Sequence, residues 1–195
     1  MRHHLVAAVF SIAGTQLACS DPTGSGTGRA EALIQDTPIG TGTVSGSLAG
    51  NVFASISADG TTWVDLGSPN GITVPLQLTA TTSTVHGEAD AAAGVYSRVR
   101  LTFHGVVARL QAGSVVGGVT LTSEANITLG GADQRVELTV TVPSFTVDAD
   151  PSVQRTVLFE LRSHLWLTAT ALQAGTVEDA ALQAAVQATT RLDPR

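Results

Sequence analysis

Aromatic and cationic side chains at alternating positions of two segments form the set best suited to binding chemistry in this sequence. The set comprises Tyr96, Arg98, Arg100, Arg162, His164 and Trp166. Residues two apart in an extended strand lie on one face, so pairing of the two segments in one sheet would gather all six into an outward patch. Such a patch suits an anionic or glycan partner. The alternative, which we favour, is cross-strand ion pairing that merely covers the sheet. Its candidate pairs join Arg98 or Arg100 to Glu137 or Glu160.

Three imidazoles beyond the first residues of the chain could in principle hold a zinc ion. They belong to His86, His104 and His164. No two of them have the close spacing of a zinc-ligand pair, and the last two fall at positions predicted to face solvent. We therefore interpret all three as surface residues and expect no metal among them.

Acidic residues near a predicted turn form a weak candidate calcium site. Asp148 and Asp150 lie in an Asp-Ala-Asp-Pro stretch, and the other acids considered are Glu88, Asp90 and Asp133. Carboxylate oxygens are the ligands that calcium takes, but the spacing lacks the further ligands and the glycine of an EF-hand loop. The same stretch is typical of an ordinary turn, which is the interpretation we favour.

No combination of nucleophile, base and orienting group is recognisable. No serine lies in a Gly-x-Ser-x-Gly elbow, and the single cysteine, Cys19, falls in a predicted tether. Aromatic residues are only 4% of the chain, which disfavours the aromatic-rich surroundings of a sugar-cleaving carboxylate pair. We predict a protein that is not an enzyme and has no cofactor. A hydrolytic enzyme with a dispersed site is the third hypothesis.

The N-terminal residues have the order of an export signal. A short basic region at 2–4 precedes an apolar run at 5–12 that is too short to span a bilayer. Cys19 and a Gly/Ser/Thr-rich stretch follow, an order that resembles a bacterial lipoprotein signal, in which the thiol is acylated. Gln16 departs from the usual aliphatic residue, so secretion with cleavage near Ala18 is the alternative. We predict a signal peptide over 1–18, a tether over 19–28, and membrane anchoring in the bacterial cell envelope.

Composition and charge exclude some classes of partner. All ten basic residues are arginines, they are scattered singly, and the formal net charge is −6. Because no basic patch is available to neutralise phosphates, we expect no nucleic-acid partner. Hydrophobic residues make up 43% of the chain and charged residues 13%, which is enough for the core of one domain. A single cysteine leaves packing and hydrogen bonds to stabilise it.

Period-two alternation predicts strands over most of the chain, most clearly at 93–103. There we expect an inward face of Val95, Ser97, Val99, Leu101 and Phe103, and an outward face of Tyr96, Arg98, Arg100 and Thr102. A hairpin is predicted around Asp59-Gly60. Pro143 is predicted to end the strand at 134–142, and 154–169 is predicted to be the longest strand.

Only the end of the chain changes period. Thr176 followed by Asp179 resembles a helix start, and 180–191 is rich in alanine and glutamine. We predict an all-β fold, an antiparallel β-sandwich of immunoglobulin or transthyretin type, over 29–172. One short C-terminal helix and a tail follow at 173–195.

Four motifs together resemble a known family. They are Gln35-Asp36-Thr37-Pro38, Asp59-Gly60 with Trp63, the strand Gly94-Val95-Tyr96-Ser97-Arg98-Val99-Arg100-Leu101, and the strand Val157-Leu158-Phe159-Glu160-Leu161. Over roughly 29–172 the chain resembles the domain-of-unknown-function family 4382, a group of exported bacterial and archaeal β domains that includes many lipoproteins. Thr37 replaces the usual alanine, and the first hairpin is unusually rich in glycine. The family has no established activity, so the resemblance implies a fold and export and transfers no functional residue.

These patterns lead to one main expectation about function. We predict an exported, non-enzymatic lipoprotein domain with a binding or structural role in the cell envelope, attached to the membrane through Cys19. The alternative is a module that binds a glycan or calcium through the arginine and aromatic face or through loop carboxylates. A glycan or an envelope protein is the expected partner.

Overall fold

The computed structural model describes residues 26–36, 44–66, 70–77, 82–131 and 133–193. Within 70–77, 82–86 and 190–193 it describes the backbone alone. The predicted signal peptide and Cys19 lie outside the described residues, and so does most of the predicted tether.

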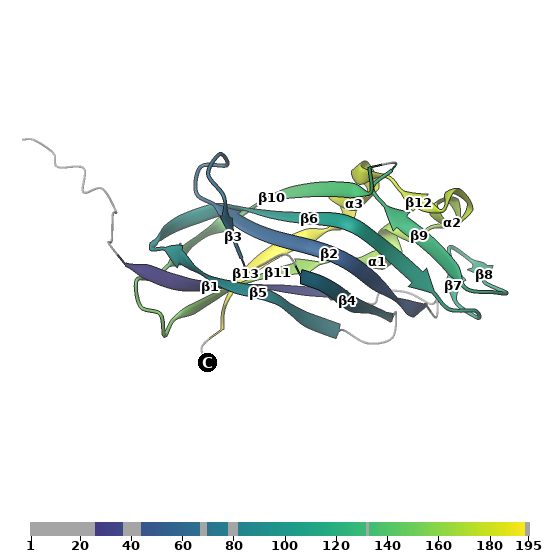
Figure 1. Ribbon diagram of the computed structural model, residues 1–195, viewed down its shortest axis with the longest axis horizontal. Helices are drawn as coiled ribbons and strands as arrows, with labels where there is room; N and C mark the ends of the chain where they lie inside the picture. Colours follow the sequence, from purple (N-terminus) through teal and green to yellow (C-terminus); the bar gives the residue numbers. More distant parts are fainter. Residues whose placement is uncertain (1–25, 37–43, 67–69, 78–81, 132, 194–195) are drawn as a thin grey trace, which may run out of the picture.

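Two facing β-sheets form the body of the molecule (Figure 1). The strands of the four-stranded sheet, in spatial order, are β13 (Gln187–Asp193), β11 (Gln154–Glu160), β1 (Thr27–Asp36) and β5 (Thr82–Ala92). The seven-stranded sheet contains β12 (Thr176–Val177), β9 (Ala125–Leu129), β6 (Gly94–Leu110), β2 (Ser45–Ser57) and β3 (Val64–Asp65), with β10 (Arg135–Val147) beside β6 and β4 (Asn70–Gln77) beside β2. A small hairpin pairs β7 (Val115–Val116) with β8 (Val119–Thr120). The β-rich fold predicted from alternation is confirmed.

One hydrophobic core lies between the sheets. It includes Ile34 and Phe159 of the four-stranded sheet and Val99, Leu101 and Phe103 of β6, none more than 1% exposed. The three β6 residues are the centre of the inward face predicted from the sequence. Burial of such apolar side chains supplies most of the free energy that holds the two layers together.

The prediction of a purely antiparallel sandwich is wrong, because two strand pairs are parallel. β1 pairs with β11 in parallel over seven residue pairs, and β12 pairs with β9 in parallel. A parallel pair needs a long crossover, and the chain between β1 and β11 supplies one by building most of the second sheet. Strand alternation alone carries no information about which strands become neighbours.

Irregularities at both ends of β6 reverse its faces. Near its start, Thr141 of β10 is opposite Arg98 and Phe145 is opposite Tyr96, so three residues of β10 stand against one of β6. Val95 is consequently 53% exposed and Tyr96 only 6%, which contradicts the predicted faces at these two positions.

The same irregularity accommodates Pro143. The prediction that this proline ends its strand is wrong, since β10 continues to Val147. Three residues bulge away from the ladder at this point, so the missing N–H of proline costs no ladder hydrogen bond.

The predicted strand at 154–169 is also wrong beyond Glu160. Arg162 adopts a left-handed conformation with φ 50°, and α1 (Ser163–Trp166) begins directly after it. The buried carboxylate of Asp36 accepts hydrogen bonds from the Ser163 N–H, at 2.8 Å, and from its hydroxyl. These bonds fix the turn that ends the strand.

Helical segments then cross from one sheet to the other. α2 (Ala169–Ala174) leads to β12 in the seven-stranded sheet, and α3 (Asp179–Ala185) leads back to β13 in the four-stranded sheet. The predicted C-terminal helix exists but ends at Ala185, so the chain after it is a strand and not a tail. No helix in the described part of the chain is long and apolar enough to span a membrane.

Candidate functional site

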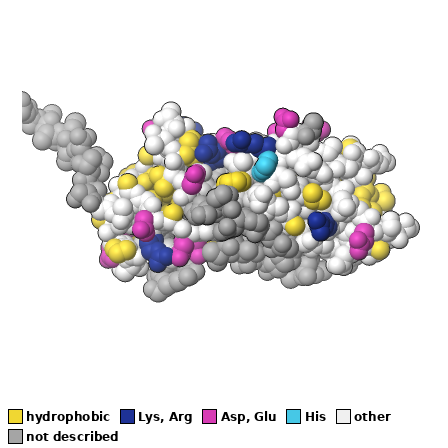
Figure 2. Space-filling model, viewed as in Figure 1, with side chains coloured by type: hydrophobic (Ala, Val, Ile, Leu, Met, Phe, Trp, Pro, Cys, Tyr) yellow, Lys and Arg dark blue, Asp and Glu magenta, His cyan; other side chains and the backbone are white. Residues whose placement is uncertain are grey.

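A polar cleft of about 330 Å³ opens on the outer face of the seven-stranded sheet. Its lining comes from four adjacent strands and consists of Phe53, Ser55, Asp65, Arg100, Thr102, His104, Arg135 and Glu137. In Figure 2 basic side chains and a histidine gather over the region where Figure 1 draws β6 and β10.

Strand register brings these side chains together. Asp65 of β3 pairs with Ser55 of β2, and Ser55 pairs with Arg100 of β6, which makes one row across the sheet. In the next row Thr102 lies between Phe53 and Glu137. Because outward residues recur every second position, neighbouring rows stack into a continuous polar surface.

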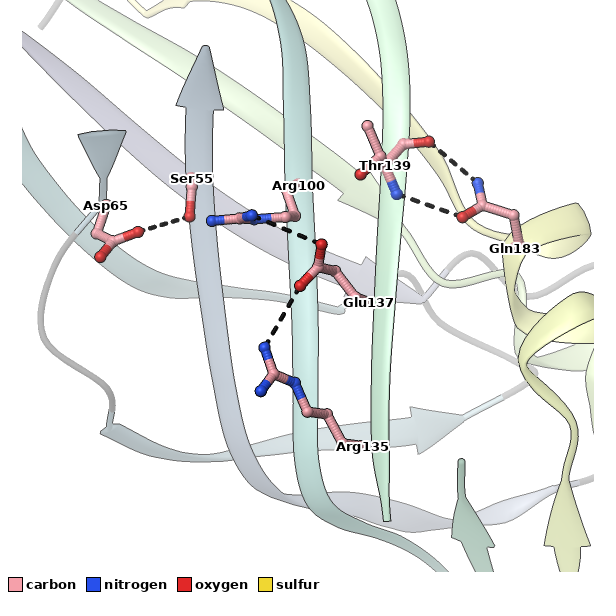
Figure 3. Close-up of polar contacts among 7 residues, drawn as sticks. All are labelled: Ser55, Asp65, Arg100, Arg135, Glu137, Thr139 and Gln183. Atoms are coloured by element: carbon pink, nitrogen blue, oxygen red, sulfur yellow. Dashed lines mark hydrogen bonds and ion pairs between the residues drawn. The ribbon is translucent and has the colours of Figure 1, made fainter. Parts of the chain in front are cut away.

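Two arginines share one carboxylate in the cleft (Figure 3). The Arg100 Nη1 lies 3.5 Å from one oxygen of Glu137, and the Arg135 Nη2 lies 3.4 Å from the other. Their side chains are 23% and 62% exposed, respectively, so Arg100 is the partly buried member. Its Nε is buried and has no hydrogen-bond partner among the residues that the structure describes. The cleft therefore holds more N–H donors than the acceptors beside them use.

The β2–β3 hairpin supplies one wall of the site. It stands above the sheet in Figure 1, and the Trp63 ring on it lies 4.3 Å from the guanidinium carbon of Arg100. At its tip the Asp59 carboxylate accepts 2.8 Å hydrogen bonds from the backbone N–H groups of Thr61 and Thr62. These bonds hold the pKa of Asp59 well below its usual value. The predicted hairpin is confirmed, with Gly60 in the left-handed region at φ 81°.

Ser55 and His104 line the same cleft but do not form a nucleophile and its base. The Ser55 hydroxyl donates directly to Asp65 at 2.7 Å. His104 is four residues from Arg100 along β6, about 13 Å at the usual rise per residue, while Ser55 is opposite Arg100. A hydrolytic triad places an imidazole between the hydroxyl and the carboxylate, and that order is absent from these three residues.

The six residues predicted to form one binding patch are separated. Arg98 and Arg100 share the outer face of β6, whereas Tyr96 is buried and donates its hydroxyl to the Ala92 carbonyl at 2.9 Å. Burial raises the pKa of Tyr96. The other three residues, Arg162, His164 and Trp166, follow β11 in and before α1 and are not on a strand. Trp166 is 1% exposed and donates to the Leu161 carbonyl at 2.9 Å.

One of the cross-strand ion pairs predicted as the alternative to a binding patch is present. Arg100 pairs with Glu137, while Glu160 accepts a 3.2 Å hydrogen bond from Gln35. Thus the pairing predicted to cover the sheet also forms the centre of the cleft.

The candidate calcium residues have protein partners. Asp148 forms an ion pair with Arg155 at 3.4 Å. Asp150 accepts from the hydroxyl and N–H of Ser152, at 2.7 and 2.8 Å, and these bonds lower its pKa. The described residues contain no group of three or more His, Cys, Asp and Glu side chains that could hold a metal ion.

Most residues of the cleft were not predicted from the sequence. The alternation predicted at 134–142 already placed Glu137 on an outer face, and Arg135 follows from the same period. Ser55, Asp65 and Trp63 lie near the predicted hairpin, but only strand pairing shows that this hairpin adjoins β6. The sequence did show charged residues on the predicted outer faces of two strands, but it did not show that these strands are neighbours.

Comparison with known proteins gives no relative from which a function could be carried over. No family model, curated protein or solved structure matches the chain.

Proposed function

We propose that this chain is an exported, lipid-anchored binding domain that holds an acidic saccharide in the Arg100 cleft. The observation that carries the proposal is the sharing of the Glu137 carboxylate by two arginines, one of which keeps a buried Nε without a partner in the described part of the chain. A guanidinium presents five N–H donors in a fixed fork that suits a carboxylate. Two arginines and two carboxylates, Glu137 and Asp65, balance in charge in the cleft, so unused guanidinium donors, and not net charge, are what it offers a ligand.

The rest of the cleft favours a sugar over a simple anion. Phe53 and the Trp63 ring offer apolar surface, and Ser55, Thr102 and His104 offer hydrogen-bonding groups beside it. Saccharides combine apolar ring faces with many hydroxyls, and a sugar carboxylate adds the charge that the arginines attract. Binding is preferred to hydrolysis because sugar cleavage needs a pair of available carboxylates, and here Glu137 pairs with the two arginines while Asp65 accepts from the Ser55 hydroxyl.

Titration with digalacturonate tests the proposal. Arg100→Gln should weaken binding at least tenfold, since a hydrogen bond to a charged group contributes about 1.5–3 kcal/mol. Arg29→Gln is the matched control, because Arg29 pairs with Glu88 on the other sheet and is 42% exposed. Equal affinity of the native chain and Arg100→Gln, or the absence of any binding, would overturn the assignment.

Export and anchoring rest on the sequence pattern before Cys19. Metabolic labelling with a fatty-acid analogue should label the native chain and leave Cys19→Ser unlabelled. Equal absence of label in both would remove the anchor from the proposal. Membership of the family 4382 and an immunoglobulin- or transthyretin-like strand order belong to the same proposal, supported by the quoted motifs and by the two facing sheets.

A further inference from the structure

A second polar cleft, of about 220 Å³, lies farther along β6. Its lining includes Ser47, Arg109, Gln111, Glu124 and Asn126. Register places Arg109 between Ser47 of β2 and Asn126 of β9, in a row across the same sheet as the first cleft. Among the described residues no ion pair or hydrogen bond engages the Arg109 side chain.

A bulge in β6 at Gly105 and Val106 places the second cleft on the same outer face of the sheet as the first. Counting by twos from Arg100 would put Arg109 on the inward face with Val99 and Leu101. Gly105, at φ 62°, and Val106 instead stand opposite Gly50, so the faces exchange at this point. Beyond it Val106, Ala108 and Leu110 are buried and Arg109 is exposed. Both arginines thus lie on the outer face.

The two arginines are separated by nine positions of one strand, on the order of 30 Å at the usual rise per residue. Between them the outward residues of β6 are Thr102, His104 and Val107, and the carboxylate opposite Thr102, Glu137 of β10, is paired with the arginines of the first cleft. The outer face is a polar track with an arginine cleft at each end.

We infer that the ligand is an extended acidic polysaccharide that lies along β6, with one carboxylate at Arg100 and another, several sugar residues away, at Arg109. The inference rests on the proposed function of the Arg100 cleft and extends it to a polymer. Single uronates contact one cleft only, whereas a chain long enough to span the strand engages both. Joining two sites in one ligand makes the second contact intramolecular, which raises the overall affinity.

The distance between the two arginine clefts favours a polysaccharide over a nucleic acid as the ligand. A nucleic-acid strand carries a phosphate about every 3.4 Å and depends on many basic contacts, as its counterion release requires. The protein offers two arginine clefts on the order of 30 Å apart and has a formal net charge of −6. A hydroxyl-rich sugar chain that is held at two of its carboxylates and needs few basic contacts elsewhere fits this arrangement.

Calorimetric titration of the purified full-length chain with digalacturonate and with long polygalacturonate tests the inference. The polymer should bind the native chain roughly tenfold or more tightly per site than the dimer. Arg109→Gln should abolish that gain and leave digalacturonate binding unchanged, while Arg100→Gln should weaken both ligands. Arg29→Gln controls for the loss of one positive charge, and neutral dextran and a thymidine homopolymer serve as comparison polymers.

The outcomes separate the two claims. If digalacturonate binds through Arg100 but the polymer gains nothing and Arg109→Gln has no effect, the polymer inference fails and the proposed function stands. If digalacturonate does not bind, both fail. If the thymidine homopolymer binds as tightly as polygalacturonate, the ligand class is wrong.

Discussion

At the scale of single residues, Glu137 sets how much positive charge the cleft presents. Its two oxygens lie 3.5 and 3.4 Å from Arg100 and Arg135 and compete with any incoming carboxylate. Glu137→Gln keeps the shape of the side chain and removes its charge, so binding of digalacturonate should tighten several-fold. Because exposed ion pairs contribute about 0–1 kcal/mol, the variant should unfold at nearly the native denaturant concentration.

A calorimetric titration beside a denaturant curve checks both parts of this prediction. The matched control is Glu88→Gln, which removes a carboxylate paired with Arg29 on the other sheet and should leave binding unchanged. Weaker binding by Glu137→Gln would mean that this carboxylate orients the arginines for the ligand and does not compete with it.

Asp59 makes the hairpin wall of the cleft sensitive to acid. Hydrogen bonds from the backbone N–H groups of Thr62 and Thr61 depress its pKa, so folding favours the ionised form. The stabilisation is complete above the unfolded-state pKa, about 3.9, and is lost as pH falls toward the lower folded-state value. Trp63 fluorescence should therefore be constant from neutral pH to about pH 4 and change only below it.

The fluorescence reports the hairpin because the other tryptophan, Trp166, is 1% exposed. Asp59→Ala should show an altered Trp63 signal already at neutral pH. Asp150→Ala removes another carboxylate of lowered pKa, outside the hairpin, and should keep the native profile. An unchanged neutral spectrum in Asp59→Ala would show that Trp63 is positioned by Arg100 alone.

At the scale of elements, the β6 bulge determines which residues reach the outer face. Gly105 has φ 62°, and a Cβ built there would meet no atom within 4 Å. Gly105→Ala should therefore destabilise through backbone conformation alone, by about 1–2 kcal/mol. Gly94 also has open space at its Cβ and lacks a positive φ, so Gly94→Ala should be neutral or stabilising by up to about 1 kcal/mol.

Denaturant unfolding of the two variants measures the difference. Gly105→Asn should lose less than Gly105→Ala, since asparagine tolerates the left-handed region better. Equal stability of the two alanine variants would mean that the bulge relaxes into another register.

A side chain of α3 covers part of the edge of β10, a contact that could not be predicted from the sequence. The outer edge of β10 is unpaired at Thr139, and the Gln183 side chain of α3 binds both its backbone groups, at 3.3 and 3.2 Å (Figure 3). Its amide thus takes the place of a neighbouring strand and protects an edge that is otherwise open to pairing with another chain. The sequence predicted a helix here but not the strand against which it packs.

The sequence predicted elements far better than their arrangement. Val99, Leu101 and Phe103 were placed correctly because a period of two survives in the middle of β6. Val95 and Tyr96 were misplaced because a bulge exchanges the faces, and a bulge has no periodic signature. Half of the binding patch was assigned to a strand that ends at Glu160, so its residues do not reach the cleft.

At the scale of the whole molecule, the buried contact between Asp36 and Ser163 fixes the point where the chain leaves the four-stranded sheet. Asp36 is fully buried and accepts from the N–H and the hydroxyl of a residue 127 positions away. Asp36→Ala would leave both buried donors without an acceptor, and each unsatisfied group costs about 1–3 kcal/mol. We expect a loss of about 2–4 kcal/mol in the free energy of unfolding.

Asp150 is a matched control, because it accepts the same two bonds from Ser152 in an exposed local turn. Asp150→Ala should leave the free energy of unfolding close to that of the native chain, since water replaces the lost acceptor. Asp36→Asn should lie between, because its carbonyl still accepts from the Ser163 N–H. Chemical denaturation followed by circular dichroism measures all three. Equal small losses in both alanine variants would show that the segment from α1 to α3 is held by apolar packing, which includes the buried Trp166, and not by this buried carboxylate.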